Sequence, residues 1–233
     1  MTHKNINTKF MIEYDKANVT SSYPSLTDYE RATILDRAYN ALIAQKMTGN
    51  NIRRTPFEYD VKAISDLQPL VVTEQNVLIE DNLDSRYNVV SYYLPNLTYE
   101  FLYFVGASLE YHVDNPADEM QDRACIVNLV DHQTANKFIA SNSNLPWIKQ
   151  PVAYIENNNL CVVYDPYDKP DVNTLCLTYI KAPKKFVGDN EDDEFELNDT
   201  MAEELISLAV AFALENVESP RLNSKINTRG LEA

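Results

Sequence analysis

Acidic side chains are the residues of this sequence whose types and spacing could do chemistry. Asp165, Asp168 and Asp171 lie in a Pro-rich stretch, and a denser acidic run extends from Asp189 to Glu196. Carboxylate oxygens are ligands that calcium prefers, but neither cluster has the order of an EF-hand loop with its central glycine. We interpret both clusters as solvated loop charges and keep calcium binding as the alternative.

Other signatures of catalysis are missing from the sequence. The chain has 4 glycines, which are too scattered for a P-loop or a dinucleotide fingerprint, and no GxSxG motif occurs. His3, His112 and His132 are far apart and show no zinc-ligand spacing. We therefore predict no catalytic residue, no cofactor, no metal site and no enzyme activity. A carboxylate-dependent hydrolase remains an alternative, because two acids that converge across a cleft cannot be recognised from spacing.

Composition predicts an acidic globular protein. Of 233 residues 45% are hydrophobic, and the formal net charge is −15. Such a surface repels phosphate backbones, so tight nucleic-acid binding is not expected. We interpret the charge first as a source of solubility and keep a passage through which DNA slides as the alternative. Cys125, Cys161 and Cys176 lie in or beside apolar runs and are expected to be reduced core thiols. The polar N-terminus lacks a signal peptide and no long apolar segment suggests a membrane span, so we expect folding in the cytoplasm.

A helix that is apolar on every side is predicted near the end of the chain, over Thr200–Val217. Thr200 and Glu203 have the spacing of a capping box, and Ser207 is the only polar residue between Leu205 and Leu214. A helix of this kind must be covered all round. Either the same chain covers it, or part of the cover comes from a neighbouring subunit.

The first part of the chain predicts an arm followed by helices. Residues 1–24 have few periodic apolar positions and suggest an extended arm. Thr27 and Glu30 form a capping box, and apolar residues that include Tyr39 and Leu42 repeat at helical spacing, which predicts a helix over Asp28–Met47. A shorter helix is expected to begin at Thr55 and to end near Asp66.

The middle of the chain predicts strands. Short β-branched and aromatic runs include Leu70–Val72, Asn88–Tyr93 and Phe101–Val113. The clearest hairpin joins Val152–Ile155 to Leu160–Tyr164 through an Asn-rich turn, since Asn tolerates positive φ. We expect Leu175–Lys181 to complete a meander with this hairpin, and a short helix near residues 131–140.

The order of helices, strands and a final helix predicts an α+β fold. We expect the N-terminal helices and the long C-terminal helix to be packed together, with a central antiparallel β-rich region in the form of a sheet or a small sandwich. The expected parts are an N-terminal arm (1–24), a helical part (25–69 and 198–219), a β-rich part (70–187) and a C-terminal arm (220–233).

Tyrosine is abundant, with 15 residues. Tyrosine is favoured at protein interfaces because it combines a large contact area with a polar tip, and clusters of tyrosine also bind sugars. The alternative is that the tyrosines simply alternate between core and surface along strands. The tyrosines to which these interpretations apply are Tyr92, Tyr93, Tyr99, Tyr103 and Tyr111.

Two segments of the sequence resemble a known family. Leu26–Tyr39 (LTDYERATILDRAY) and Phe195–Leu197, which leads through the apolar helix to Glu218–Asn223, are similar to the virion ring proteins of crAss-like bacteriophages. The wider plan, with a strand-rich centre ending in Tyr179–Pro183, also resembles the head-to-tail adaptors of short-tailed phages. The resemblance covers about residues 25–225 and is most specific at its two ends.

The resemblance implies a structural virion protein without catalysis. It implies a closed ring of about twelve copies in the neck or tail barrel, below the portal protein and around the DNA channel, assembled in the cytoplasm of the host bacterium. The implied partners are further copies of the chain, the portal protein and other neck or tail rings, and DNA passes without sequence-specific binding. A tail appendage that binds glycans is the alternative.

The expected interface residues lie on the helices and in the C-terminal tail. The positive charges of Arg221, Lys225 and Arg229 are expected to dock on an acidic surface of a neighbouring subunit, with an exposed, disordered tail as the alternative. As subunit-interface or buried-helix residues we predict Leu205, Leu208, Phe212, Arg221, Leu222, Lys225, Arg229, Tyr39 and Leu42.

Overall fold

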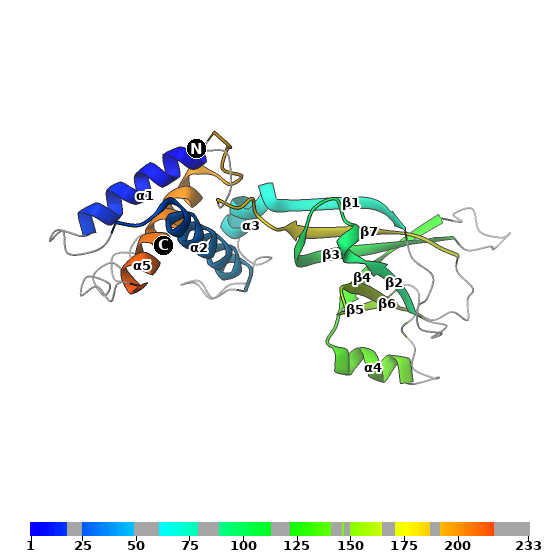
Figure 1. Cartoon of the computed structure of the whole chain (residues 1–233). Coiled ribbons are helices and arrows are strands. Elements are labelled where there is room, and N and C mark those ends of the chain that lie inside the picture. Colours follow the sequence, from blue (N-terminus) through cyan, green and yellow to red (C-terminus); the bar gives the residue numbers. More distant parts are fainter. Residues whose placement is uncertain are drawn as a thin grey trace. The chain divides into compact units, whose positions relative to one another are not determined.

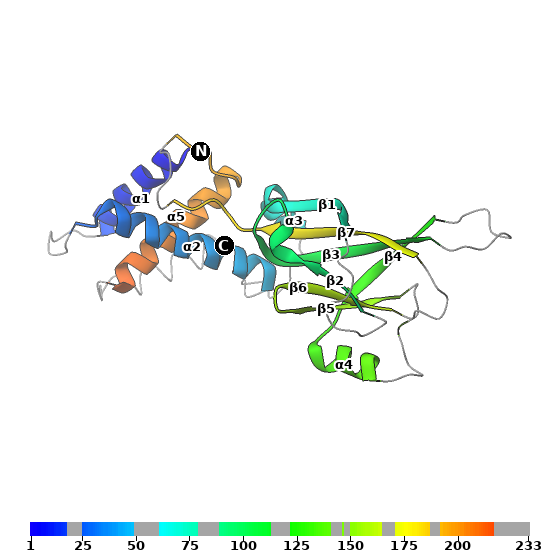
Figure 2. The same cartoon turned by 45° about the vertical axis from the view of Figure 1, so that its right-hand side comes forward.

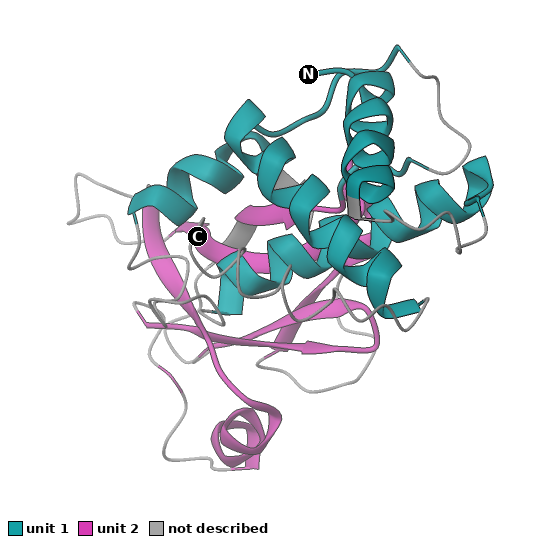
Figure 3. Ribbon diagram, turned by 90° about the vertical axis from the view of Figure 1, so that its left-hand side faces the viewer, with its two compact units in different colours: residues 1–70, 183–233 teal, residues 71–182 magenta. Residues whose placement is uncertain are grey.

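The protein combines α-helices with one seven-stranded mixed sheet, as seen in a computed structural model (Figure 1; Figure 2). The structure describes residues 1–17, 25–48, 61–78, 89–112, 122–140, 146, 150–164, 171–186 and 192–216. The chain divides into two compact units (Figure 3). Residues 1–70 and 183–233 form the helical unit, and residues 71–182 form the sheet unit.

The helical unit contains four of the described helices. They are α1 (His3–Ala17), α2 (Asp28–Thr48), α3 (Val61–Leu67) and α5 (Asp199–Asn216), and a short 3-10 helix, Gln68–Leu70, follows α3. Both α1 and α2 contact α5.

Helix α1 shows that the expected N-terminal arm is wrong. Ile6, Phe10 and Tyr14 are 0%, 0% and 2% exposed, and their spacing of four residues places them on one helix face. Backbone bonding also fixes the start of the chain, since Thr2 forms an isolated β-bridge with Glu194. The first residues are thus part of the core. The expected C-terminal arm lies outside the described residues.

Helix α2 begins where the capping box predicts. The Thr27 backbone N–H donates to Glu30 Oε2 over 2.8 Å, and the Glu30 backbone N–H donates to Thr27 Oγ1 over 3.3 Å. This reciprocal pair satisfies backbone donors that the first helical turn leaves free. The predicted helix over Asp28–Met47 is confirmed, with its observed end one residue later.

Helix α5 is capped by a different residue from the one expected. Asn198 Oδ1 accepts a hydrogen bond of 2.8 Å from the backbone N–H of Met201, so Asn198 is the N-cap and Thr200 is already inside the helix. The predicted capping box of Thr200 and Glu203 is therefore wrong, because Asn198 reaches the free donors first. The start of the shorter helix predicted at Thr55 lies outside the described residues.

The sheet unit contains every strand of the sheet and one helix. The elements are β1 (Val71–Leu78), β2 (Val89–Tyr93), β3 (Phe101–His112), β4 (Asp122–Leu129), α4 (His132–Ala140), β5 (Val152–Glu156), β6 (Asn159–Val163) and β7 (Asp171–Lys181). The strand order is β1-β7-β3-β4-β5-β6-β2.

The predicted hairpin is confirmed, but the predicted meander is wrong. Strands β5 and β6 pair antiparallel, and the turn residues Asn157 and Asn158 have φ values of 50° and 63°. Strand β7 does not pair with β6 and instead lies between β1 and β3. Its partners are distant in the sequence, so the local order of strands could not predict this pairing.

One strand pair is parallel, which corrects the expectation of an antiparallel sheet. Strands β4 and β5 run in the same direction, with Asn128 opposite Val152 and Leu129 opposite Ala153. A parallel pair needs a crossover connection, and α4 lies in that connection. Ala135 of α4 is fully buried against β5 and β6, so the predicted short helix is confirmed and covers one face of these strands.

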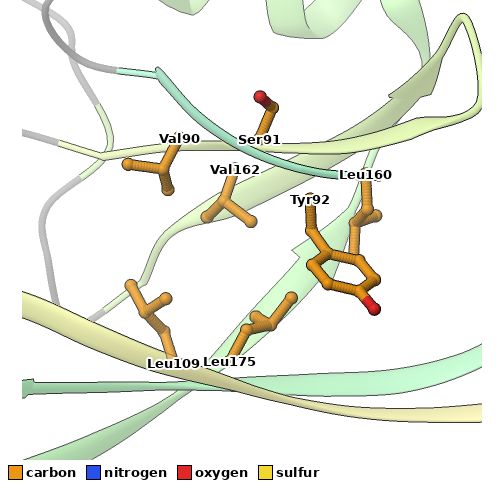
Figure 4. A pocket seen from close by; sticks show the side chains of 7 residues that line it. All are labelled: Val90, Ser91, Tyr92, Leu109, Leu160, Val162 and Leu175. Atoms are coloured by element: carbon orange, nitrogen blue, oxygen red, sulfur yellow. The ribbon is translucent and has the colours of Figure 1, made fainter. Parts of the chain in front are cut away.

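The sheet curls so that its two halves share one core. Leu109 of β3 and Leu175 of β7 face Leu160 and Val162 of β6 across an apolar gap (Figure 4). The gap has no room for a water-sized sphere. The interior of the sheet unit is thus close-packed at this place rather than hollow.

Candidate subunit interface

The predicted interface residues of the helices form the core of the helical unit. Leu205 and Leu208 on α5 are 0% and 2% exposed, and Tyr39 and Leu42 on α2 are 1% and 2% exposed. These values refer to a single chain. One copy therefore covers these four side chains without a neighbour.

The burial of α5 shows whether the same chain or a neighbouring subunit covers this apolar helix. Eleven residues of α5 are buried, from Met201 to Leu214, within one chain. A neighbouring subunit is not required to enclose the helix. Any interface between copies would therefore use other surfaces than the buried face of α5.

Phe212 is the predicted α5 residue that reaches the surface of the helical unit. Its side chain is half-buried, and the guanidinium carbon of Arg37 lies 4.4 Å from the centre of its ring. Arg37 also lies 4.0 Å from a carboxylate oxygen of Glu215. A guanidinium over an aromatic face is attracted by the ring quadrupole, so Arg37 holds Phe212 in place. The predicted tail residues Arg221, Leu222, Lys225 and Arg229 lie outside the described residues.

Every charged side chain of α5 is acidic, and other helices supply the cations. Glu203 pairs with Lys9 of α1. Glu204 lies 3.0 Å from Lys46 Nζ of α2 and 3.5 Å from Lys62 Nζ of α3. These pairs join α5 to three other helices.

Lys46 is the centre of a buried polar network. Its Nζ lies 3.1 Å from Asp66 Oδ2, and Asp66 Oδ1 accepts a hydrogen bond of 3.2 Å from the Asn198 side chain. Asp66 is only 4% exposed. Burial disfavours the charged form of Lys46, but Glu204 and Asp66 outweigh it and raise the pKa of the ammonium group. The network links α2 and α3 to the N-cap of α5.

Aromatic rings bring together the two segments that carry the resemblance. The ring centres of Tyr39 and Phe195 lie 5.1 Å apart, and Phe186 lies 6.3 Å from Tyr39. His3 stacks on Phe186 at 4.2 Å, so this histidine is a core residue rather than a ligand of a site. Burial, with a smaller effect from the charge of Glu196, raises the pKa of Tyr39 and keeps its phenol neutral.

The tyrosines of the sheet unit divide between core and surface. Tyr92 and Tyr111 are 7% and 3% exposed, whereas Tyr93 and Tyr99 are 40% and 49% exposed. Tyr99 contacts a cation, because Lys181 Nζ lies 4.8 Å from its ring centre. Alternation along the strands accounts for the buried tyrosines.

The described residues offer no candidate metal site. No group of three or more His, Cys, Asp or Glu side chains that could hold a metal ion occurs among these residues. Asp165 and Asp168 of the first acidic cluster lie outside them. All cysteines are free thiols; Cys125 and Cys161 are buried as predicted, and Cys176 is half-buried. Among the described helices, none has the length and apolar character needed to span a bilayer.

Comparison with known proteins adds no assignment. No protein-family model matches the chain, and no curated protein shows significant sequence similarity to it.

The residues of the polar network, Lys46, Asp66 and Glu204, were not predicted from the sequence. In a helix, Lys46 and Glu204 lie on the same face as nearby apolar residues. This spacing is the signal in the sequence that could have indicated their burial.

Proposed function

We propose that this chain is a structural virion protein that forms a ring in the head-to-tail connector of a bacteriophage. In this proposal about twelve copies close into a ring below the portal protein, and DNA passes through the channel without sequence-specific binding. The chain would carry out no reaction and use no cofactor. Its partners would be other copies, the portal protein and neighbouring rings.

The observation that carries the proposal is the place where the two resembling segments meet. Leu26–Tyr39 lies on and just before α2, and Phe195–Leu197 leads into α5, more than 150 residues later in the sequence. Tyr39 and Phe195 are nevertheless in ring contact at 5.1 Å. Leu26–Tyr39 and Phe195–Leu197 are thus parts of one packed unit, and Glu218–Asn223 lies outside the described residues. We further propose the α+β arrangement in which the N-terminal helices and the C-terminal helix act together as the body of the ring subunit.

The charge of the chain agrees with a passage for DNA. Lys and Arg number 20 against 35 Asp and Glu. An acidic wall repels the phosphate backbone and so prevents DNA from adhering during packaging and ejection. Strong DNA binding by the isolated protein would count against this part of the proposal.

A glycan-binding tail appendage is the second candidate, and exposed tyrosines favour it. Tyr93 and Tyr99 of the sheet unit are 40% and 49% exposed, and Lys181 lies over the ring of Tyr99. Aromatic rings of this kind stack on sugars. Binding on a glycan array that is lost in the Tyr93→Ala and Tyr99→Ala variants would favour this candidate over the ring.

Electron microscopy of the full-length protein and of virions tests the ring. The proposal expects closed rings with a central hole, and the protein in the neck of the particle. A protein that remains monomeric at all concentrations and is missing from purified virions would refute it.

A further inference from the structure

The backbone edges that stay unpaired among the described residues include those of β1, of part of β4, and of β2, which ends the sheet opposite β1. Strand β1 is the last strand at one side of the sheet and pairs only with β7. Strand β4 pairs with β3 over Asp122–Val127, but its contact with β5 is limited to Asn128 and Leu129. Among the described residues, no strand pairs with the other side of Asp122–Val127. The four-stranded part β1-β7-β3-β4 therefore has a free edge on each side.

The peptide groups of β4 point toward this free edge. The backbone N–H of Asn128 donates to Pro151 O over 3.0 Å, and that of Val130 donates to Ala153 O over 2.8 Å, so even-numbered residues bond away from β3. Because peptide groups alternate along a strand, Ala124 and Ile126 point their N–H and C=O groups the same way, beyond the end of the β5 contact. A row of this kind is a template for another strand.

Over Ala124–Asn128 the outer face of this edge is uncharged and includes an exposed isoleucine. Cys125 and Val127 face the core, so Ala124, Ile126 and Asn128 lie on the outer face of the sheet. Ile126 is 74% exposed. Sheet edges are usually protected by lysine, proline or a bulge. The outer face of this edge carries none of these at the three positions.

The free edge of β1 resembles it in chemistry. Strand β1 has 8 residues, with a register shift between Glu74 and Val77 in its pairing with β7. Val72 packs on the core and Glu74 accepts a hydrogen bond from Tyr179 Oη, so Val71, Thr73 and Gln75 lie on the outer face. These three residues are uncharged as well. In a chain with a net charge of −15, the uncharged positions 71, 73 and 75 of β1 and 124, 126 and 128 of β4 allow two copies to approach there without repulsion between like charges.

We infer that β4 of one copy pairs with β1 of the next copy. The two edges are different surfaces on opposite sides of the same four strands, so the contact is heterologous and can repeat around a ring. Pairing of β4 with another β4 would close a dimer and stop. Ile126 would then lie beside Val71 or Thr73 of the neighbour, and β-branched cross-strand pairs of this kind are favourable. This inference rests on the proposed ring and names the surfaces that join its subunits.

Cross-linking of the full-length protein tests the contact. Thr73→Cys and Ile126→Cys are combined in a Cys176→Ser background, and Val71→Cys or Gln75→Cys replaces Thr73→Cys to scan the register. Mild oxidation should give a ladder of covalent dimers and larger species on a non-reducing gel. The matched pair Tyr29→Cys and Ile126→Cys, which joins β4 to an exposed position on α2, should give no ladder.

A second pair of variants separates the edge contact from folding and from the ring itself. Ile126→Lys should abolish assembly, and Val61→Lys, at a position that is 83% exposed on α3, should leave it intact, with equal thermal stability in both. If Ile126→Lys still forms rings and the cysteine pairs give no ladder, the edge contact is wrong and the proposed function stands. A ladder without closed rings would support the edge contact and refute the ring. A monomer without a ladder would overturn both.

Discussion

The side-chain nitrogen of Lys46 lies 3.0 Å from a carboxylate oxygen of Glu204, and this contact joins α2 to the first turns of α5. The same ammonium group lies 3.1 Å from Asp66, whose carboxylate is almost fully buried. A single lysine therefore neutralises two acids that come from different helices. Removal of the lysine would leave Asp66 as a buried charge without its partner.

We expect Lys46→Met to destabilise the helical unit strongly. Breaking a buried pair by removing one partner costs about 3–5 kcal/mol, because the remaining charge stays desolvated. Lys62→Met is the matched control: Lys62 pairs with the same Glu204, but its side chain is 48% exposed, so its loss should cost less than about 1 kcal/mol. Urea unfolding followed by circular dichroism measures both. Equal destabilisation by the two substitutions would contradict the buried network.

Substitutions in α5 should act on the isolated subunit and not only on assembly. Leu208 is 2% exposed in one chain, so Leu208→Asp buries an unpaired charge at a cost of roughly 3 kcal/mol or more and should prevent folding. Phe212→Asp should cost less, because Phe212 is only half-buried and lies beside Arg37. The soluble fraction and the helical signal of each variant measure the effect. A folded, soluble Leu208→Asp monomer would show that one chain does not cover this position.

The free energy of unfolding should fall in alkaline solution because the thiol of Cys125 is buried. Burial raises the pKa of this thiol from its ordinary value of 9.0 to about 11, and its S–H group donates to Leu109 O over 3.6 Å. The unfolded chain loses the proton first, so the contribution of the group is fully present below pH 9 and is lost as the pH rises toward 11, by about 1.4 kcal/mol for each unit.

Comparison with Cys125→Ala removes the titration of groups that do not interact with this thiol. Tyr111 is coupled to it, because burial and then the charge of Cys125 raise the pKa of Tyr111. The difference in the free energy of unfolding between wild type and variant should shift by about 2 kcal/mol between pH 8 and pH 11. A difference that stays constant over this interval would mean that the thiol is not desolvated in the folded protein.

Arg221→Glu should weaken assembly and leave the monomer folded. Arg221, Lys225 and Arg229 concentrate positive charge in an acidic chain, and reversal of one charge would repel the acidic neighbour on which we predict that they dock. Sedimentation measures assembly and circular dichroism measures folding. A variant that assembles like the wild type would eliminate this contact.

Elements specified by local signals could be predicted from the sequence. The capping box of Thr27 and Glu30 predicts the start of α2, and the Asn-rich turn predicts the hairpin of β5 and β6. Both features depend on residues within a few positions of one another. The apolar spacing of Ile6, Phe10 and Tyr14 was present but was too sparse to be recognised as a helix among polar residues.

Features that depend on distant partners could not be predicted. Strand β7 pairs with β1 and β3, about 100 and 70 residues earlier, and no local pattern indicates which edge it joins. The same holds for the candidate site. Tyr39 and Leu42 were predicted as subunit-interface or buried-helix residues from their helical spacing, and both are buried within one chain. The meeting of Lys46, Asp66 and Glu204 requires three helices to be placed first.

The most direct test of the central claim is electron microscopy of the full-length protein under the conditions that favour self-association, combined with mass measurement of the particles. The account predicts closed rings with a central hole and a mass of about twelve subunits. Particles that are uniformly monomeric, from a protein that is also missing from purified virions, would contradict it.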